Sequence, residues 1–238
     1  MTLSSEAVQY AKDHKKDILT RFADDTRYPS VKNPFTIFMA GSPGAGKTEF
    51  SNSFDPNTFA YKTDVPIVRI DADEIRKMMP GYNGINASEF QAAATIGVEK
   101  LFDFANHKDQ NILLDTTFSD FAKAKMNVER SLKHNRKVGI FYIHLDPKIA
   151  WIYTQLRERK EGRKVSQEFF VESYFNSREV VNKIKKDYPI IELNIVQKYI
   201  SESLSKPIQT TSFFNIPNVD NYIKLEYTRH SLSELLKV

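Results

Sequence analysis

Residues 41–48 read GSPGAGKT and follow directly on a continuous apolar run at residues 35–40, and this juxtaposition constrains the chain more than any other feature. The eight residues fit the pattern G-x-x-x-x-G-K-[ST], and residues 49–54 behind them are compatible with a helix. Glycine tolerates positive φ and close approach of a ligand, so successive backbone N–H groups can converge on an anion. The pattern therefore predicts a buried strand, a phosphate-binding loop and a helix, in that order.

The residues of this loop divide into two groups by their expected task. Lys47 is placed to reach the β- and γ-phosphates of a nucleotide, and the hydroxyl of Thr48 is placed to hold Mg²⁺. The backbone of the preceding residues is expected to surround the phosphates: Gly41, Ser42, Pro43, Gly44, Ala45 and Gly46. The alternative is an ordinary glycine-rich turn, but three of the chain's 8 glycines fall within this short stretch. We therefore predict that the chain binds a nucleotide together with Mg²⁺.

Further apolar runs of strand length follow along the chain. Two of them, at residues 66–73 and 111–115, end in acidic residues, and another at residues 137–145 precedes Asp146-Pro147, a favourable helix start. After Pro189, apolar and polar residues alternate as in one more strand. Helical spacing fills the other long segments, at residues 5–22, 88–105, 149–160 and 166–186.

Strands that alternate with helices predict an α/β fold, a mainly parallel sheet flanked by helices as in P-loop NTPases and kinases. We expect a single domain over residues 1–238, with an N-terminal helix, a core over about residues 33–200 and a small C-terminal extension over residues 201–238. Ser88 and Gln91 have the spacing of a capping box, which would start the helix that follows them.

Composition excludes several classes of protein. The 238 residues are 41% hydrophobic and 27% charged, as in ordinary globular proteins, and they include no cysteine. Thiol catalysis, disulfides and cysteine-ligated zinc are therefore excluded, and the 5 histidines lack metal-ligand spacing. We find neither an apolar leader nor a stretch of about 18 apolar residues, so we expect a cytoplasmic protein without a membrane partner.

The net charge of +4 does not distinguish a nucleic-acid ligand from an anionic metabolite. Arg130, Lys133, Arg136 and Lys137 form a basic patch in the sequence, without the interleaved aromatic residues of a nucleic-acid-binding module. We interpret this patch as the solvated end of a helix, and we do not expect a nucleic-acid partner.

Acidic residues at the ends of two strand runs are the main candidates for chemistry. Asp71 and Asp73 are two residues apart, so in an extended segment their side chains would point the same way, and the carboxyl ends of parallel strands are where ligands bind. One of them is a candidate general base for an acceptor hydroxyl. Asp115 resembles a Walker B acid, which contacts Mg²⁺ directly or through water. Each of these acids has an alternative role as a helix N-cap.

Arg157, Arg159 and Arg163 cluster where one predicted helix ends and a loop begins. Such a cluster is typical of a lid whose guanidinium groups clamp a transferring phosphate, and the alternative is a solvated, charged helix face. The phosphate-binding pattern favours the lid. A guanine-reading N-K-x-D sequence is missing, and the chain is short for a helicase or transporter motor. A kinase of a small molecule or of a nucleic acid is therefore the leading class.

Taken together, four segments resemble the zeta toxin family of P-loop kinases over about residues 33–188: MAGSPGAGKTEF, RIDADEIRKMMPGY, NILLDTTF and the EGR sequence at the lid. Members of this family use ATP to phosphorylate the 3′-hydroxyl of the sugar in UDP-N-acetylglucosamine, and many are neutralised by a small antitoxin. The resemblance implies the same kinase activity here, with ATP and Mg²⁺, a nucleotide-sugar substrate and a possible small antitoxin as protein partner.

The resemblance also implies roles for individual residues. Asp73, the second acid of IDAD, matches the catalytic base, and Glu99 matches a substrate-binding glutamate on the helix before the third strand. Arg163 matches the second lid arginine, whereas Arg157 and Arg159 compete for the first; we assign Arg159 to nucleotide binding. The predicted catalytic residues are therefore Lys47, Asp73, Arg157 and Arg163.

This chain departs from the family after the third strand. The family has Glu-Gly-Thr there, whereas this chain has Asp115-Thr116-Thr117, which shortens the acid and keeps a hydroxyl at Thr117. Asp115 and Thr117 are predicted to contact the substrate together with Glu99 and Asp71, and Asp115 is predicted to share the metal with Thr48.

Two other functions stay open from the sequence. One is a P-loop kinase of another small metabolite or of nucleic-acid ends, and saturable transfer to an oligonucleotide would favour it. The other is a non-catalytic, ATP-dependent switch protein whose partner is a protein, and ATP binding without a phosphorylated product would favour that.

Overall fold

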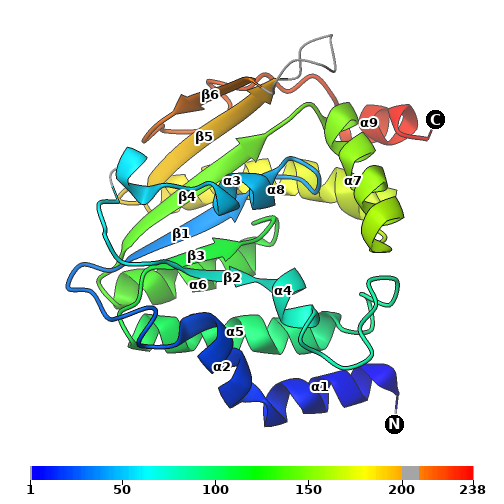
Figure 1. Ribbon diagram of the computed structural model, residues 1–238. Coiled ribbons are helices and arrows are strands. Elements are labelled where there is room, and N and C mark those ends of the chain that lie inside the picture. Colours follow the sequence, from blue (N-terminus) through cyan, green and yellow to red (C-terminus); the bar gives the residue numbers. More distant parts are fainter. Residues whose placement is uncertain (1, 60, 200–208, 238) are drawn as a thin grey trace.

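The fold is built on one twisted sheet (Figure 1). The computed structural model describes residues 2–59, 61–199 and 209–237. Within them, six strands are hydrogen-bonded in the order β2-β3-β1-β4-β5-β6. Their bounds are Phe35–Ala40 for β1, Val68–Asp71 for β2, Ile112–Asp115 for β3, Lys137–His144 for β4, Glu192–Tyr199 for β5 and Gln209–Phe213 for β6. Strands β1 to β5 pair in parallel and β6 is antiparallel to β5, so the expected mainly parallel sheet is confirmed.

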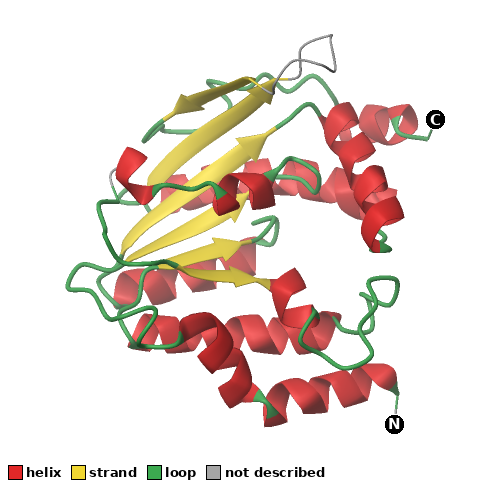
Figure 2. Cartoon of the chain, viewed as in Figure 1, coloured by secondary structure: helices red, strands yellow, loops and turns green. Residues whose placement is uncertain are grey.

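Helices flank this sheet, as Figure 2 shows. Their bounds are Leu3–Asp13 for α1, Lys15–Ala23 for α2, Lys47–Asn52 for α3, Ala72–Arg76 for α4, Gln91–His107 for α5, Phe121–Lys133 for α6, Pro147–Glu161 for α7, Gln167–Asp187 for α8 and Arg229–Leu235 for α9, with a 3-10 turn at Pro56–Thr58. This α/β arrangement agrees with the fold class expected from the alternating pattern.

Two separate hydrophobic clusters stabilise the two faces of the sheet. Successive side chains of a strand point to opposite faces, so Phe38 packs into one cluster and its neighbour Ile37 into the other. The first cluster takes buried residues from α1, α2, α5, α6 and the end of α8, and the second takes them from α7, α9 and the start of α8. Every residue of β1 is buried, which explains its continuous apolar sequence.

The N-terminal segment differs from the sequence prediction. A single helix over residues 5–22 is wrong, because α1 ends at Asp13, α2 begins at Lys15, and His14 between them has non-helical backbone angles. The spacing of apolar residues continued across this break, and so the pattern did not reveal it.

The start of α5 also differs from the prediction. Ser88 and Gln91 do not form a capping box, since α5 begins at Gln91 and the residue before it, Phe90, makes no side-chain cap. The Gln91 side chain accepts a hydrogen bond from Arg76 on α4 instead. A tertiary contact therefore replaces the local one that the sequence predicted.

The basic patch at residues 130–137 is only partly the solvated helix end that we expected, since Lys133 and Lys137 are exposed but the two arginines are not. Arg136 is 3% exposed, and its guanidinium donates to the Thr36 hydroxyl at 2.7 Å and to the Phe35 carbonyl oxygen at 2.7 Å. Arg130 is held by Glu99 at 2.7 Å. These arginines therefore join helix, loop and sheet inside the molecule.

The C-terminal extension packs onto the edge of the sheet and onto α8. Strand β6 pairs with β5, with Phe213 opposite Ile195, and Leu232 of α9 is buried in the second cluster. Residues 201–208 of the extension lie outside the described part of the chain. Among the described helices we find none with the length and apolar character that crossing a membrane requires.

His144, at the end of β4, should make the stability of this fold sensitive to acid. Burial, with help from the positive charge of Arg178, lowers the pKa of His144 from 6.5 to about 4. Between these values the unfolded chain binds a proton that the folded chain does not, so stability should fall as the pH decreases from 6.5 to 4, by about 3 kcal/mol in full. Urea unfolding of the wild type and of His144→Gln at several pH values measures this, and equal slopes against pH for the two proteins would contradict it.

Candidate active site

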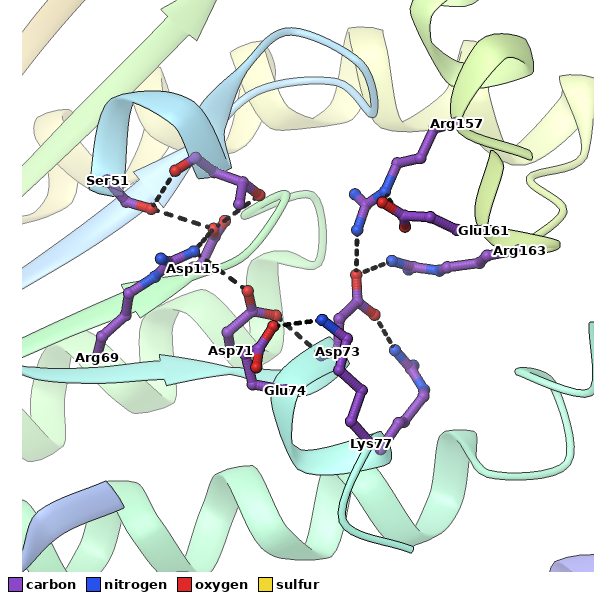
Figure 3. A network of polar contacts seen from close by, with 12 residues as sticks. Ser51, Arg69, Asp71, Asp73, Glu74, Lys77, Asp115, Arg157, Glu161 and Arg163 are labelled. Carbon is purple, nitrogen blue, oxygen red and sulfur yellow. Dashed lines mark hydrogen bonds and ion pairs between the residues drawn. The ribbon is translucent and has the colours of Figure 1, made fainter. Parts of the chain in front are cut away.

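The candidate site lies at the edge of the sheet where β1, β2 and β3 end (Figure 3). Asp71 is the last residue of β2 and Asp115 the last of β3, and the two are opposite each other in register. The glycine-rich loop at residues 41–46 leaves the end of β1 and leads into α3. Ligands of open α/β sheets bind beyond such strand ends. The predicted acids and the predicted phosphate-binding loop thus meet at one edge.

The three glycines of the loop, Gly41, Gly44 and Gly46, all have positive φ. Gly44 and Gly46 have φ values of 72° and 82°, in the left-handed region that favours glycine. A Cβ on Gly44 would overlap the carbonyl oxygen of Ala150 on α7, and one on Gly46 would overlap the Lys198 Nζ of β5. Lys198 itself donates to the Gly46 carbonyl oxygen at 2.8 Å. The loop is therefore held closely between α7 and β5.

Lys47 folds back into the loop. Its ammonium donates to the carbonyl oxygens of Gly41 at 3.0 Å and Ser42 at 2.7 Å. Burial lowers the pKa of Lys47 to about 8; Asp115 opposes this, while the positive charges of Arg157 and Arg163 add to it. The amine is thus desolvated, and its hydrogen-bond acceptors among the described residues are neutral oxygens, so an anion in the loop would stabilise its charged form.

Asp115 gathers polar groups from two elements, α3 and β2. Its Oδ2 accepts hydrogen bonds from the Thr48 hydroxyl at 3.2 Å, the Ser51 hydroxyl at 3.4 Å and the Arg69 guanidinium at 3.4 Å. In the described residues, no three His, Cys, Asp or Glu side chains come together as a metal-binding group. Mg²⁺ usually takes only one or two carboxylates from the protein, with water and phosphate oxygens as its other ligands. The Thr48 and Asp115 oxygens therefore fit this ion.

Asp71 serves the local structure. Its side chain accepts from the Asp73 backbone N–H at 2.8 Å and so caps α4, and it pairs with Arg69 at 3.2 Å. Burial, together with the negative charges of Asp115 and Asp73, raises the pKa of Asp71 to about 6. The capping role that the sequence left as an alternative is thus the one observed, and its contact with a substrate stays a prediction.

Asp73 is the centre of a cluster of positive charge. Its Oδ1 pairs with Arg76, and its Oδ2 pairs with Arg163 and, at 2.9 Å, with Arg157 (Figure 3). The expectation that Asp71 and Asp73 point the same way is wrong, because the strand ends at Asp71 and α4 begins at Ala72. The turn into the helix directs Asp73 toward Arg157 and Arg163.

The other predicted residues lie as follows. Arg157 contacts Asp73, whereas Arg159 is exposed on α7, so of the two competing arginines Arg157 belongs to the cluster. Glu99 is 2.7 Å from Arg130 on α6, and the Thr117 hydroxyl is 2.8 Å from that of Ser119. Roles of Arg159 in nucleotide binding and of Glu99 and Thr117 in substrate binding stay predictions.

The end of α7 touches the loop that follows α4. A Cβ on Gly84, where φ is 86°, would overlap the carbonyl oxygen of Glu161 at the end of α7. A Cβ on Gly162 would lie 2.8 Å from the Ile85 side chain. Close backbone packing between the two segments therefore depends on glycine at both positions.

Sequence reasoning missed four polar residues of this site: Ser51, Arg69, Arg76 and Gln91. Arg76 had a usable signal, because an arginine three residues after an aspartate on a helix lies on the same face. Ser51 and Arg69 had none, since their contacts with Asp115 join segments 64 and 46 residues apart. Such contacts depend on how the elements pack.

Solved structures of similar fold include a toxin-antitoxin system and complexes of two proteins. PezAT, a chromosomal toxin-antitoxin system of Streptococcus pneumoniae, matches at 20% identity and a TM-score of 0.59, over 82% of this chain and 80% of that chain. The complex AvrRxo1-ORF1:AvrRxo1-ORF2 with sulphate ions matches at 12% identity and a TM-score of 0.58, over 92% of this chain and 70% of that chain. The AvrRxo1-ORF1:-ORF2 complex with ATP matches at 12% identity and a TM-score of 0.53, over 83% of this chain and 63% of that chain. At these identities the likeness shows the fold.

The sequence comparisons bear on the family. A search of curated proteins found no match. The family model of the zeta toxins matches residues 19–206, well over half of the chain, and this range includes the phosphate-binding loop, Asp73, Asp115 and the lid arginines. The resemblance seen in the sequence motifs is confirmed, and the chain belongs to the zeta toxin family.

Proposed function

We propose that this protein is an ATP-dependent kinase that phosphorylates a sugar hydroxyl of a UDP-activated amino sugar of the UDP-N-acetylglucosamine type. The observation that carries the proposal is the position of Asp73, which lies between two lid arginines and at the same edge of the sheet as the glycine-rich loop. A base, a phosphate-binding loop and positive charge near the transferred group are parts that phosphoryl transfer uses.

In this proposal each group has one task. Lys47 and the loop backbone hold the phosphates of ATP, and Thr48 and Asp115 hold Mg²⁺, which when bound neutralises phosphate charge. The acceptor oxygen forms a bond to the γ-phosphorus while the bond to the β–γ bridging oxygen breaks, so ADP leaves. The hydroxyl proton passes to Asp73, and Arg157 and Arg163 move from Asp73 to the γ-phosphoryl oxygens, where they stabilise the developing charge.

The acceptor and the protein partner rest on the family. Zeta toxins phosphorylate a nucleotide sugar, and we assign the same substrate class here, with Glu99, Thr117, Asp71 and Asp115 as candidate contacts. Of the similar structures, one belongs to a toxin-antitoxin system, another is a two-protein complex, and a third is that complex with ATP. They support ATP as the donor and a small antitoxin as the partner.

Mass spectrometry tests the activity directly. The protein would be incubated with ATP, Mg²⁺ and a panel of UDP-sugars, oligonucleotides and small alcohols, with Asp73→Asn as the control. We expect one phosphoryl mass gain on an amino-sugar nucleotide, absent with the variant. A phosphoryl mass gain on oligonucleotides alone would mean that the acceptor is a nucleic acid and not a nucleotide sugar. ATP binding without any phosphorylated product would favour a non-catalytic, ATP-dependent switch protein.

The contact between the end of α7 and the loop after α4 should be needed for a full rate of phosphoryl transfer. Gly84→Ala forces these segments apart, because its Cβ would overlap the Glu161 carbonyl oxygen, and we expect about a 10- to 100-fold lower transfer rate, since misplacement by 1 Å costs about 100-fold. Gly81→Ala is the matched control, since Gly81 has a similar φ of 80° but its Cβ would meet only the Leu3 side chain at 3.7 Å. Equal rates in the two variants would show that closure of this contact is unimportant.

A further inference from the structure

Arg76 differs from the other arginines around Asp73. It is the last residue of α4 and is 2% exposed, whereas the side chains of Arg157 and Arg163 are 42% and 29% exposed. One of its terminal nitrogens pairs with Asp73, and the other donates to the Gln91 side chain at the start of α5. A buried arginine is thus fixed from two sides, on the helix that carries the proposed base.

The two carboxylate oxygens of Asp73 have different partners. Oδ1 faces Arg76, and Oδ2 faces Arg157 and Arg163. The lid arginines lie 84 and 90 residues further along the chain and are partly exposed, so they can leave when phosphate attracts them. Arg76 is three residues from Asp73 and is enclosed, and Gln91 restrains it. When the lid arginines leave, Oδ2 becomes free and Oδ1 stays occupied.

We propose that Arg76 is a positioning residue that holds Oδ1 of Asp73, so that Oδ2 faces the acceptor hydroxyl and takes its proton, and that Gln91 keeps Arg76 in place. The proposal rests on the proposed function, in which Asp73 is the base. It adds which oxygen acts, which neighbour orients it and how that neighbour is held.

General physical reasons favour this role over simple support of the fold. Reacting groups must be held near their productive geometry, and supporting hydrogen bonds from buried neighbours provide this. A guanidinium can contact a carboxylate and an amide with two separate N–H groups, which the single ammonium of lysine does not reproduce. Burying a charge is costly unless it is paired, so Arg76 stays on Asp73 as long as both are enclosed.

Kinetics of Arg76→Met, Arg76→Lys and Gln91→Ala test the proposal. We expect Arg76→Met to lower kcat about 100-fold with KM for ATP within about twofold of wild type, Arg76→Lys to recover part of that loss, and Gln91→Ala to lower kcat several-fold. Rates are expressed per ATP-binding site, counted by calorimetry, so that unfolded protein does not enter them. Arg178→Met is the matched control, because Arg178 is also buried and paired with an aspartate, Asp220, away from the site.

The outcomes separate positioning from folding. If Arg178→Met lowers the unfolding temperature as much as Arg76→Met does but keeps kcat, the role of Arg76 in transfer is supported. If Arg76→Met keeps kcat per binding site, or if both variants lose kcat in proportion to stability, the proposal is overturned. Asp73→Asn is assayed in parallel, and its full activity would refute the base assignment of the proposed function instead.

A second readout does not depend on turnover. A crystal structure with a non-hydrolysable ATP analogue should show Arg157 and Arg163 on the phosphates, while Arg76 remains on Oδ1 of Asp73 and on Gln91. Departure of Arg76 from Asp73 in that complex would overturn the proposal, even for a protein whose acceptor has not been found.

Discussion

Asp73→Asn is expected to lower the rate of phosphoryl transfer by about 1,000-fold or more, because a general base contributes roughly 100- to 10,000-fold to such a step. Asparagine keeps the size of the side chain but does not accept the proton of the acceptor hydroxyl. ATP should bind as well as in the wild type or better, because Arg157 and Arg163 lose a carboxylate that holds them away from phosphate. Product formation by mass spectrometry and ATP binding by calorimetry measure the two effects.

The control for this variant is Asp220→Asn. Asp220 also pairs with an arginine, Arg178, but it lies outside the site, so the transfer rate should stay at the wild-type value. Lost ATP binding in Asp73→Asn would indicate that Asp73 is a structural residue or a nucleotide ligand. An unchanged transfer rate would remove Asp73 from the chemistry altogether.

Lys47→Met should weaken ATP binding by about 100-fold, because hydrogen bonds to charged groups contribute roughly 1.5–3 kcal/mol each. The fold should tolerate the change. Burial lowers the pKa of Lys47 to about 8, which means that the protein without nucleotide disfavours the charged form, and methionine removes that charge. We therefore expect an unfolding temperature equal to or above that of the wild type, together with the loss of ATP binding.

Calorimetry and thermal unfolding measure both parts of this prediction. Lys100→Met on α5 is the control, because Lys100 is exposed and lies outside the loop. If Lys47→Met binds ATP with wild-type affinity, the loop is not the nucleotide site. If it unfolds at a much lower temperature, the two hydrogen bonds to Gly41 and Ser42 matter more for the fold than burial of the charge does.

Features that depend on residues close together in the sequence could be predicted from it. The apolar run of β1, the glycine-rich loop and Lys47 could be placed from the sequence, because a buried strand, positive φ values and a helix start are properties of short segments. The cap on α4 was open to prediction for the same reason, since Asp71 and the N–H of Asp73 are two residues apart. Family resemblance carried the candidate base at Asp73, which local patterns left undecided between two acids.

Contacts between distant segments were decided by the tertiary structure. Gln91 has the spacing of a local cap but bonds to Arg76, Arg136 appears in a basic run but is buried against β1, and Glu99 pairs with Arg130 on α6. In each case the local pattern allowed more than one partner. The packing of helices and strands decided which partner came within hydrogen-bond distance.

The sequence by itself determined the family, the α/β class and the phosphate-binding loop of this protein. Only the tertiary structure decided that Asp73 faces three arginines, that Arg157 and not Arg159 is one of them, and that Arg76 alone among them is buried. The physical reason is that backbone conformation depends on neighbouring residues, whereas the surroundings of a charge depend on every element that packs against it.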